Sequence, residues 1–154
     1  MSRRAQIVMS PEEITDFLAE GKVANFATIG PNGRPHLAAM WYFPLGDGIA
    51  TWTYRSSQKA ANLSRLAQAT VLIETGDSYE QLRGVSMECD VELVEDSEKV
   101  ALLGVELMRR YNPSKEAATA ATQFVRLQAA KRVGLVCTPT KIVSWDHRKL
   151  AGAY

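Results

Sequence analysis

The chain is poor in the residues that bind metals, form disulfides or cross membranes. Its 154 residues include only two cysteines, Cys89 and Cys137, and two histidines, His36 and His147. Because both cysteines stand in strand-like sequence, we expect buried thiols in a reducing compartment and no disulfide framework. No cluster of ligand residues has metal-site spacing, so no metal is expected. No apolar run suits a membrane span and no signal core follows the basic start, which predicts a cytoplasmic protein.

Charge and motif content exclude further classes of protein. The net charge is +1 and 46% of the residues are hydrophobic, so neither a nucleic-acid partner nor a membrane surface is indicated. The sequence contains no glycine-rich Rossmann fingerprint, no P-loop and no catalytic triad signature. No side chain is therefore prepared to catalyse a difficult reaction alone, and an enzyme of this kind would depend on an organic cofactor.

Hydrophobic periodicity predicts several strands separated by a few helices. A capping box at Ser10 begins a helix that ends at Gly21, and strands over 23–29 and 34–43 form a hairpin around the turn 30–33. Both sides of the strand 34–43 are apolar, which indicates that a partner covers it. Further strands are predicted over 49–54, 70–75, 83–94, 131–137 and 141–145, and further helices over 57–66, from 96 or 97 to 111, and over 115–130, the last two separated at Asn112-Pro113-Ser114.

This order of elements predicts a mainly β protein. Because the first strands are consecutive, they should form antiparallel hairpins, and a closed or partly closed barrel with helices over its openings is the natural architecture. The length of 154 residues suits a single domain over 1–154, with a core at about 10–146 and a short polar tail over 147–154.

The most informative stretch is the polar turn between the aromatic strand 49–54 and the helix that follows. A helix start carries unpaired N–H groups and positive partial charge, so it is suited to bind an anion. Arg55 and Lys59 add full positive charges, of which the guanidinium suits bidentate phosphate contact. The alternative is that Ser56 or Ser57 is only an N-cap and that both cations are solvated.

Aromatic residues are concentrated near this turn. They are Trp41, Tyr42, Phe43, Trp52 and Tyr54. Each could be an ordinary core residue, but together with an adjacent anion site they fit a slot for a flat ring. The residues therefore predict a phosphate clamp for a planar cofactor.

Three stretches resemble the pyridoxamine 5′-phosphate oxidase-like superfamily of split β-barrel proteins, which bind flavins and deazaflavins. They are the hairpin over 23–36, the turn Thr53-Tyr54 followed by Ser57-x-Lys59-x-x-Asn62-Leu63, and the strand Ile142-Val143-Ser144-Trp145-Asp146. The details most resemble the deazaflavin (coenzyme F420)-dependent reductases of actinobacteria, whose endings are similar to 145–150. The resemblance implies an antiparallel split β-barrel with capping helices, and a homodimer that binds its cofactor between subunits.

The resemblance also implies a set of site residues. The phosphate-bearing tail would be held by the turn and the helix, through Tyr54, Arg55, Ser56, Ser57, Lys59 and Asn62. The ring would be lined by Met40, Trp41, Tyr42 and Phe43, and Gln81 and Arg83 could reach across the dimer.

The function implied is that of an oxidoreductase, which transfers a hydride from reduced F420 to a small unsaturated or quinone-like acceptor. Solvent could supply the proton; if a side chain does, His36 and Tyr42 are the candidates. One alternative is an FMN-dependent oxidoreductase of the same fold, and another is a non-catalytic protein that binds or sequesters a cofactor, haem or pigment. The arginine-rich ending of the oxidases proper is missing, so vitamin B6 chemistry is not expected.

Overall fold

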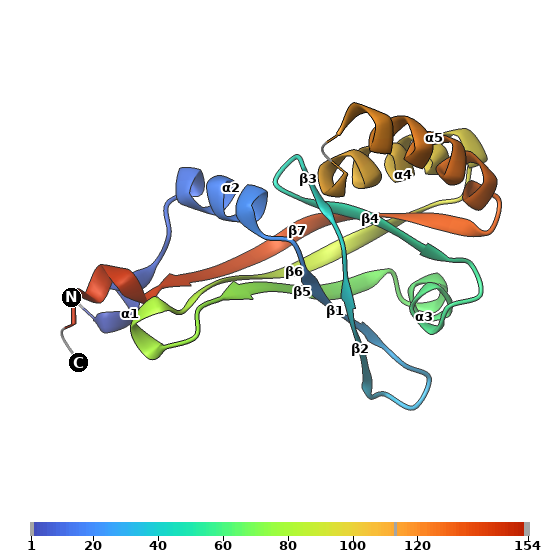
Figure 1. Ribbon diagram of the computed structural model, residues 1–154. Helices are drawn as coiled ribbons and strands as arrows, with labels where there is room; N and C mark the ends of the chain where they lie inside the picture. The colour runs from blue at the N-terminus through green and yellow to red at the C-terminus, as the bar shows by residue number, and fades with distance from the viewer. Residues whose placement is uncertain (1, 113, 153–154) are drawn as a thin grey trace.

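The computed structural model describes residues 2–112 and 114–152. The predicted helix break at Pro113 and the last two residues of the predicted tail lie outside these ranges. Seven strands form one antiparallel sheet in the order β2-β1-β5-β6-β7-β4-β3. The sheet curls into a half-barrel with helices packed around it (Figure 1). The prediction of a mainly β split barrel with peripheral helices is therefore confirmed.

The elements have the following bounds. The strands are β1 (Ala24–Ile29), β2 (Pro35–Met40), β3 (Phe43–Leu45), β4 (Gly48–Tyr54), β5 (Gln68–Thr75), β6 (Arg83–Val94) and β7 (Arg132–Asp146). The helices are α1 (Arg3–Ile7), α2 (Pro11–Glu20), α3 (Gln58–Arg65), α4 (Ser97–Tyr111) and α5 (Lys115–Ala129), with short 3₁₀ turns η1 (Tyr79–Gln81) and η2 (His147–Leu150). The capping box of α2 is present as predicted, and α1 and η2 were not predicted.

The final strand departs from the prediction, which split it at residues 138–140. β7 runs unbroken from Arg132 to Asp146 and pairs with β6 along its length, with one register shift opposite Glu88 and Cys89. β4 pairs with β7 only as far as Cys137, so one edge of β7 is open beyond that point. Pro139 is tolerated there because an open edge or a bulge does not require its missing N–H.

The predicted strand 34–43 is also interrupted, because β2 ends at Met40 and β3 begins at Phe43. β2 and β3 form the two opposite edges of the sheet. Trp41 and Tyr42 therefore carry the chain from one edge to the other, across the split of the barrel. The predicted cover over this strand is not found within the described chain, where β2 alternates exposed and half-buried positions and Leu37 is 67% exposed.

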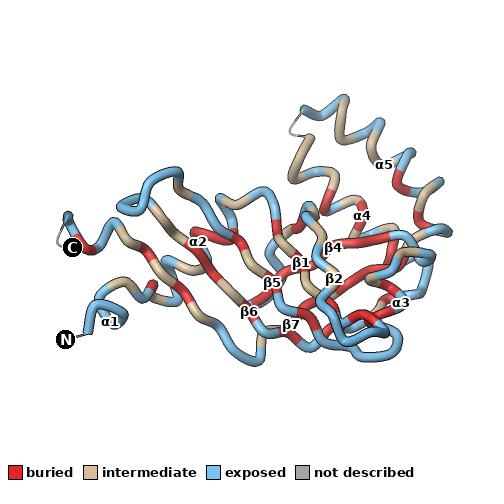
Figure 2. Tube along the Cα trace, turned by 90° about the horizontal axis from the view of Figure 1, so that it is seen from below, coloured by how far each residue is buried: buried red, intermediate tan, exposed pale blue. Residues whose placement is uncertain are grey.

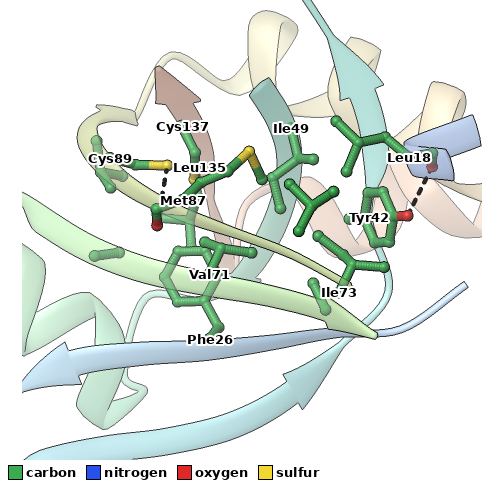
Figure 3. Packing of buried hydrophobic residues seen from close by; sticks show 14 of the residues in the cluster. Leu18, Phe26, Tyr42, Ile49, Val71, Ile73, Met87, Cys89, Leu135 and Cys137 are labelled. Carbon is green, nitrogen blue, oxygen red and sulfur yellow. Dashed lines mark hydrogen bonds between the residues drawn. The ribbon is translucent and has the colours of Figure 1, made fainter. Parts of the chain in front are cut away.

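Buried positions alternate with more exposed ones along strands such as β1 and β6 (Figure 2). The buried side chains form two clusters, one on each face of the sheet. The first lies inside the barrel, where residues such as Phe26, Ile49 and Met87 pack together (Figure 3). It also contains Cys89 and Cys137, which are free, buried thiols as predicted; burial raises the pKa of Cys89 to about 11. The second cluster lies between the outer face and the pair α4 and α5, and includes Trp52, Val94, Val100, Leu107 and Val125.

Candidate functional site

The predicted anion site lies at the end of β4, where backbone hydrogen bonds fix the turn into α3. Tyr54 pairs with Arg132 of β7, and the Arg55 N–H donates to the Lys131 carbonyl at 2.9 Å. Ser57 is the N-cap: its hydroxyl oxygen accepts the Ala60 N–H at 3.2 Å. Ser57 is thus an N-cap, and the uncapped N–H groups of the first turn of α3 have no intrahelical partner.

Lys59 is a half-buried cation without a counter-ion in the described part of the chain. No hydrogen bond or salt bridge to its ammonium is found among these residues, and burial lowers its pKa. A charge in this position is disfavoured until an anion pairs with it. Lys59 is therefore the residue whose surroundings most directly call for an anionic ligand.

Arg55 and Ser56 lie at the same turn and are exposed. The Arg55 guanidinium donates to the Glu95 carbonyl at 2.7 Å and lies 3.6 Å from the Glu95 carboxylate. An exposed pair of this kind contributes little free energy, so a phosphate could replace the carboxylate as the partner of the guanidinium.

Asn62 is placed differently from the prediction. Its side chain is fully buried, its amide donates to the Thr28 hydroxyl at 3.0 Å, and its carbonyl accepts from Gln58 at 2.8 Å. Both ends of the amide are thus occupied within the protein. Asn62 joins α3 to β1 behind the site, and the turn itself brings together Arg55, Ser56, Ser57 and Lys59.

Two further cations, Lys131 and Arg132, adjoin the turn and were missed from the sequence. The Arg132 guanidinium lies over the rings of Tyr54, at 4.0 Å, and Trp52, at 4.5 Å. Its Nε is buried and has no hydrogen-bond partner within residues 2–112 and 114–152. The available signal was a Lys-Arg pair at a strand start, but the sequence does not reveal that this strand pairs with β4.

Of the four residues predicted to line a ring, only Trp41 keeps a large exposed surface, at 48%. Met40 packs against the inner cluster and Phe43 against the outer one. Tyr42 is fully buried, and its hydroxyl donates to the Leu18 carbonyl at 2.7 Å (Figure 3). Burial raises the pKa of Tyr42, so this residue is placed as a core side chain and not as an accessible proton donor.

The remaining predicted residues are His36, Gln81 and Arg83. His36 faces Thr28 across the β1–β2 pair, and its Nδ1 is buried without a partner among the described residues. Gln81 and Arg83 lie at the opposite end of the sheet from α3 (Figure 1). Arg83 pairs there with Glu20 at 3.2 Å. Only a second chain could bring Gln81 and Arg83 to the turn.

The described ranges contain neither a metal-ligand cluster nor a membrane-spanning helix. Over the described ranges, no group of three or more histidine, cysteine or carboxylate side chains could hold a metal ion. In the same part of the chain, no helix has both the length and the apolar character needed to cross a bilayer.

The fold is that of a split-barrel protein. Its sheet forms a half-barrel, its two edge strands β2 and β3 are joined across the split, and a polar helix start follows β4. The sequence profile of the family described as pyridoxamine 5′-phosphate oxidase matches residues 10–143. The chain therefore belongs to this family. Among curated proteins, the comparison finds no match.

Several solved structures are similar to this chain. A conserved hypothetical protein from Mycobacterium tuberculosis is 42% identical, with a TM-score of 0.85, over 98% of this chain and 93% of that one. A protein named F420 reductase is 22% identical, with a TM-score of 0.63, over 82% of this chain and 93% of that one. HutZ, a heme storage protein from Vibrio cholerae, is 18% identical, with a TM-score of 0.66, over 86% and 93%. The last two likenesses show the fold alone.

Proposed function

We propose that this protein is an oxidoreductase that uses reduced F420 to transfer a hydride to a small unsaturated or quinone-like organic acceptor. The observation that carries the proposal is the half-buried Lys59 ammonium at the start of α3, which lacks a counter-ion in the described chain. A phosphate would supply the missing negative charge and would accept N–H groups of the helix start. The fold likeness to a protein named F420 reductase supports the choice of cofactor.

The backbone of Trp41 is tied to β4 a short way before the turn. The Thr51 hydroxyl donates to the Trp41 carbonyl at 2.7 Å. Thr51 precedes Tyr54 by three residues along β4, which corresponds to roughly 10 Å of strand. A ribityl chain of comparable length separates the ring of a flavin or deazaflavin from its phosphate.

The residues of the chain would bind and orient the cofactor. F420, when bound, supplies the carbon that carries the hydride. Lys59, Arg55 and Ser56 would hold the phosphate, and Trp41 would contact the ring, so that the acceptor meets a positioned partner. Solvent or His36 would supply a proton.

We propose further that the working unit is a homodimer. The exposed edge strand β2 and the distant positions of Gln81 and Arg83 support this arrangement. In a dimer, the partner could cover β2 and contribute its own copies of Gln81 and Arg83 to the site.

Two alternatives share the same binding surface. The first alternative is FMN, which has a similar ring and a phosphate. The fold likeness to a FAD-binding protein from Mesorhizobium loti supports a flavin as the cofactor. Non-catalytic binding of haem or another pigment is the second, and the fold likeness to HutZ favours it.

The test is a titration of the cofactor-free protein with F420, FMN and haem, followed by turnover. We expect micromolar or tighter binding of F420, detected by its fluorescence, and oxidation of reduced F420 in the presence of menadione. Tighter binding of FMN, with turnover, would select the flavin alternative. Haem binding without oxidation of reduced F420 or FMN would select the storage alternative, and binding of none of the three would contradict the proposal.

A further inference from the structure

We propose that Tyr111 and Arg110, at the end of α4, are positioning residues that hold the Trp41 indole as a stacking platform for a flat, electron-poor ring. The inference rests on the proposed function only in taking that ring to be the cofactor's. It assigns a role to two residues of α4 that the sequence patterns did not indicate.

The first observation is the stack itself. The rings of Trp41 and Tyr111 are parallel within 3°, with centroids 4.2 Å apart. Trp41 nevertheless remains 48% exposed. Because Tyr111 covers one face of the indole, the exposed surface includes the opposite face. That face is electron-rich, and an electron-poor planar ring such as an oxidised flavin suits it.

The second observation is that hydrogen bonds anchor the hydroxyl end of the Tyr111 side chain. Its hydroxyl accepts the Tyr42 N–H at 3.1 Å and a guanidinium N–H of Arg110 at 3.0 Å. The single hydroxyl proton is donated to the Lys22 carbonyl, the nearer acceptor at 2.6 Å, and the Tyr42 carbonyl lies 3.0 Å from the same oxygen. These bonds fix the position of the hydroxyl end of the ring, and the stack on Trp41 aligns the ring plane with the indole.

The third observation is that Arg110 ties the end of α4 to two other segments. It donates to the Tyr42 carbonyl at 2.7 Å, which lies in the link across the split of the barrel. It also donates to the carbonyls of Leu18 at 3.1 Å, Ala19 at 2.9 Å and Gly21 at the end of α2.

The consequence is a pre-organised surface. A half-exposed tryptophan in a chain link would ordinarily lose rotamer freedom when a ligand stacks on it, which weakens binding. In this protein the entropy of ordering the indole is lost when the chain folds and not when the ligand binds, because Tyr111 and Arg110 already hold the indole in place. The platform should therefore bind a flat ring even when that ring lacks a phosphate tail.

The test uses lumiflavin, the flavin ring without its tail, and the cofactor-free protein. Affinity is measured by quenching of tryptophan fluorescence and by anisotropy of the flavin. We expect Trp41→Leu and Tyr111→Leu to weaken lumiflavin binding about two- to tenfold, the range for an aromatic pair. Tyr111→Phe keeps the stack but loses the hydroxyl anchor, so its lumiflavin affinity should lie between those of the wild type and Tyr111→Leu. Trp145→Phe, at the far end of β7, is the matched control and should bind as the wild type does.

The outcomes separate positioning from a general structural role and from the proposed function. Tyr111→Leu should weaken lumiflavin but leave the affinity for inorganic phosphate unchanged, and Lys59→Ala should do the reverse. A folded Trp41→Leu protein with unchanged lumiflavin affinity, or a wild-type protein that does not bind lumiflavin, overturns the platform. If lumiflavin binding depends on Trp41 while FMN and F420 fail to bind, the platform stands and the proposed cofactor function fails.

Discussion

Replacing Lys59 with methionine tests the anion site most directly, because it removes the charge and keeps most of the apolar side-chain stem. The ammonium is half-buried and has no acidic partner in the described chain. Loss of one charge-assisted contact to a phosphate should cost about 1.5–3 kcal/mol, which is roughly a tenfold to hundredfold loss of affinity for F420 or FMN. The affinity is measured by fluorescence titration, and Lys59→Arg should retain most of it.

The Lys59→Met substitution should weaken cofactor binding but should not lower the stability of the ligand-free protein. Since burial disfavours the Lys59 charge, its removal should leave the melting temperature unchanged or raise it. In saturating phosphate, the wild type should gain stability by mass action and the Lys59→Met protein should gain less. Lys115→Met, an exposed lysine on α5, is the matched control and should change neither quantity.

The pH dependence follows from the direction of the pKa shift. The pKa of Lys59 is lowered from the ordinary value of 10.5, and only the charged form attracts phosphate. Phosphate affinity should therefore fall as pH rises through this lowered pKa, earlier than for an ordinary lysine. In the free protein the unfolded chain retains the proton to higher pH than the folded chain, so stability should rise with pH through the same window.

Three results would refute this reasoning about Lys59. They are an unchanged cofactor affinity in a folded Lys59→Met protein, a lower melting temperature of that protein without ligand, and a phosphate affinity that falls only at the pH of an ordinary lysine. The first would remove Lys59 from the binding site, and the second would assign it a structural role.

Further predictions concern the packing that supports the site. Arg110→Met should lower the free energy of unfolding in urea by about 2–4 kcal/mol, because several carbonyls lose a charged donor. Arg109 is exposed and pairs with Glu106 of the same helix, so Arg109→Met should change the free energy of unfolding by less than about 0.5 kcal/mol. Gly104→Ala places a Cβ 2.4 Å from the Trp52 ring and should lower the free energy of unfolding by about 1–3 kcal/mol. Adding Trp52→Phe to this variant should recover part of the lost stability. If the two substitutions destabilise the protein additively, the clash is not the cause. Asp146 is buried, and a hydrogen bond from Arg148 is the main cause that lowers the pKa of its carboxyl group. The contribution of Asp146 to the free energy of unfolding is therefore present above the carboxyl pKa of the unfolded chain, and it is lost as pH falls through the lower pKa of the folded chain. Asp146→Asn should therefore flatten the acid limb of stability, and an unchanged slope would exclude that contribution.

The features that could be predicted from the sequence depend on neighbours within a few residues. The capping box at Ser10 and the N-cap at Ser57 follow from side chains that reach backbone groups three residues away. The hairpin of β1 and β2 follows from its Pro and Gly turn, and the antiparallel order from consecutive strands. A polar helix start with Arg55 and Lys59 was visible for the same reason.

The structure departs from the local patterns where distant segments determine a residue's surroundings. Pro139 reads as a strand break, but it is tolerated because β4 has already ended beside it. Asn62 was expected at the phosphate, yet its amide is consumed by Thr28 of β1 and by Gln58. Tyr42 was a candidate proton donor until the chain crossed the split of the barrel and buried it against α2.

Local chemistry was thus enough to predict a capped helix start with two cations in a β-rich chain, since caps, turns and alternation act over a few residues. The pairing of β4 with β7 added Lys131 and Arg132 to that site, and the packing of α4 against the β2–β3 link set Tyr111 under Trp41. These arrangements depend on contacts between segments far apart along the chain, which no local pattern encodes. The tertiary structure alone decides which of the predicted residues are exposed and which belong to the core.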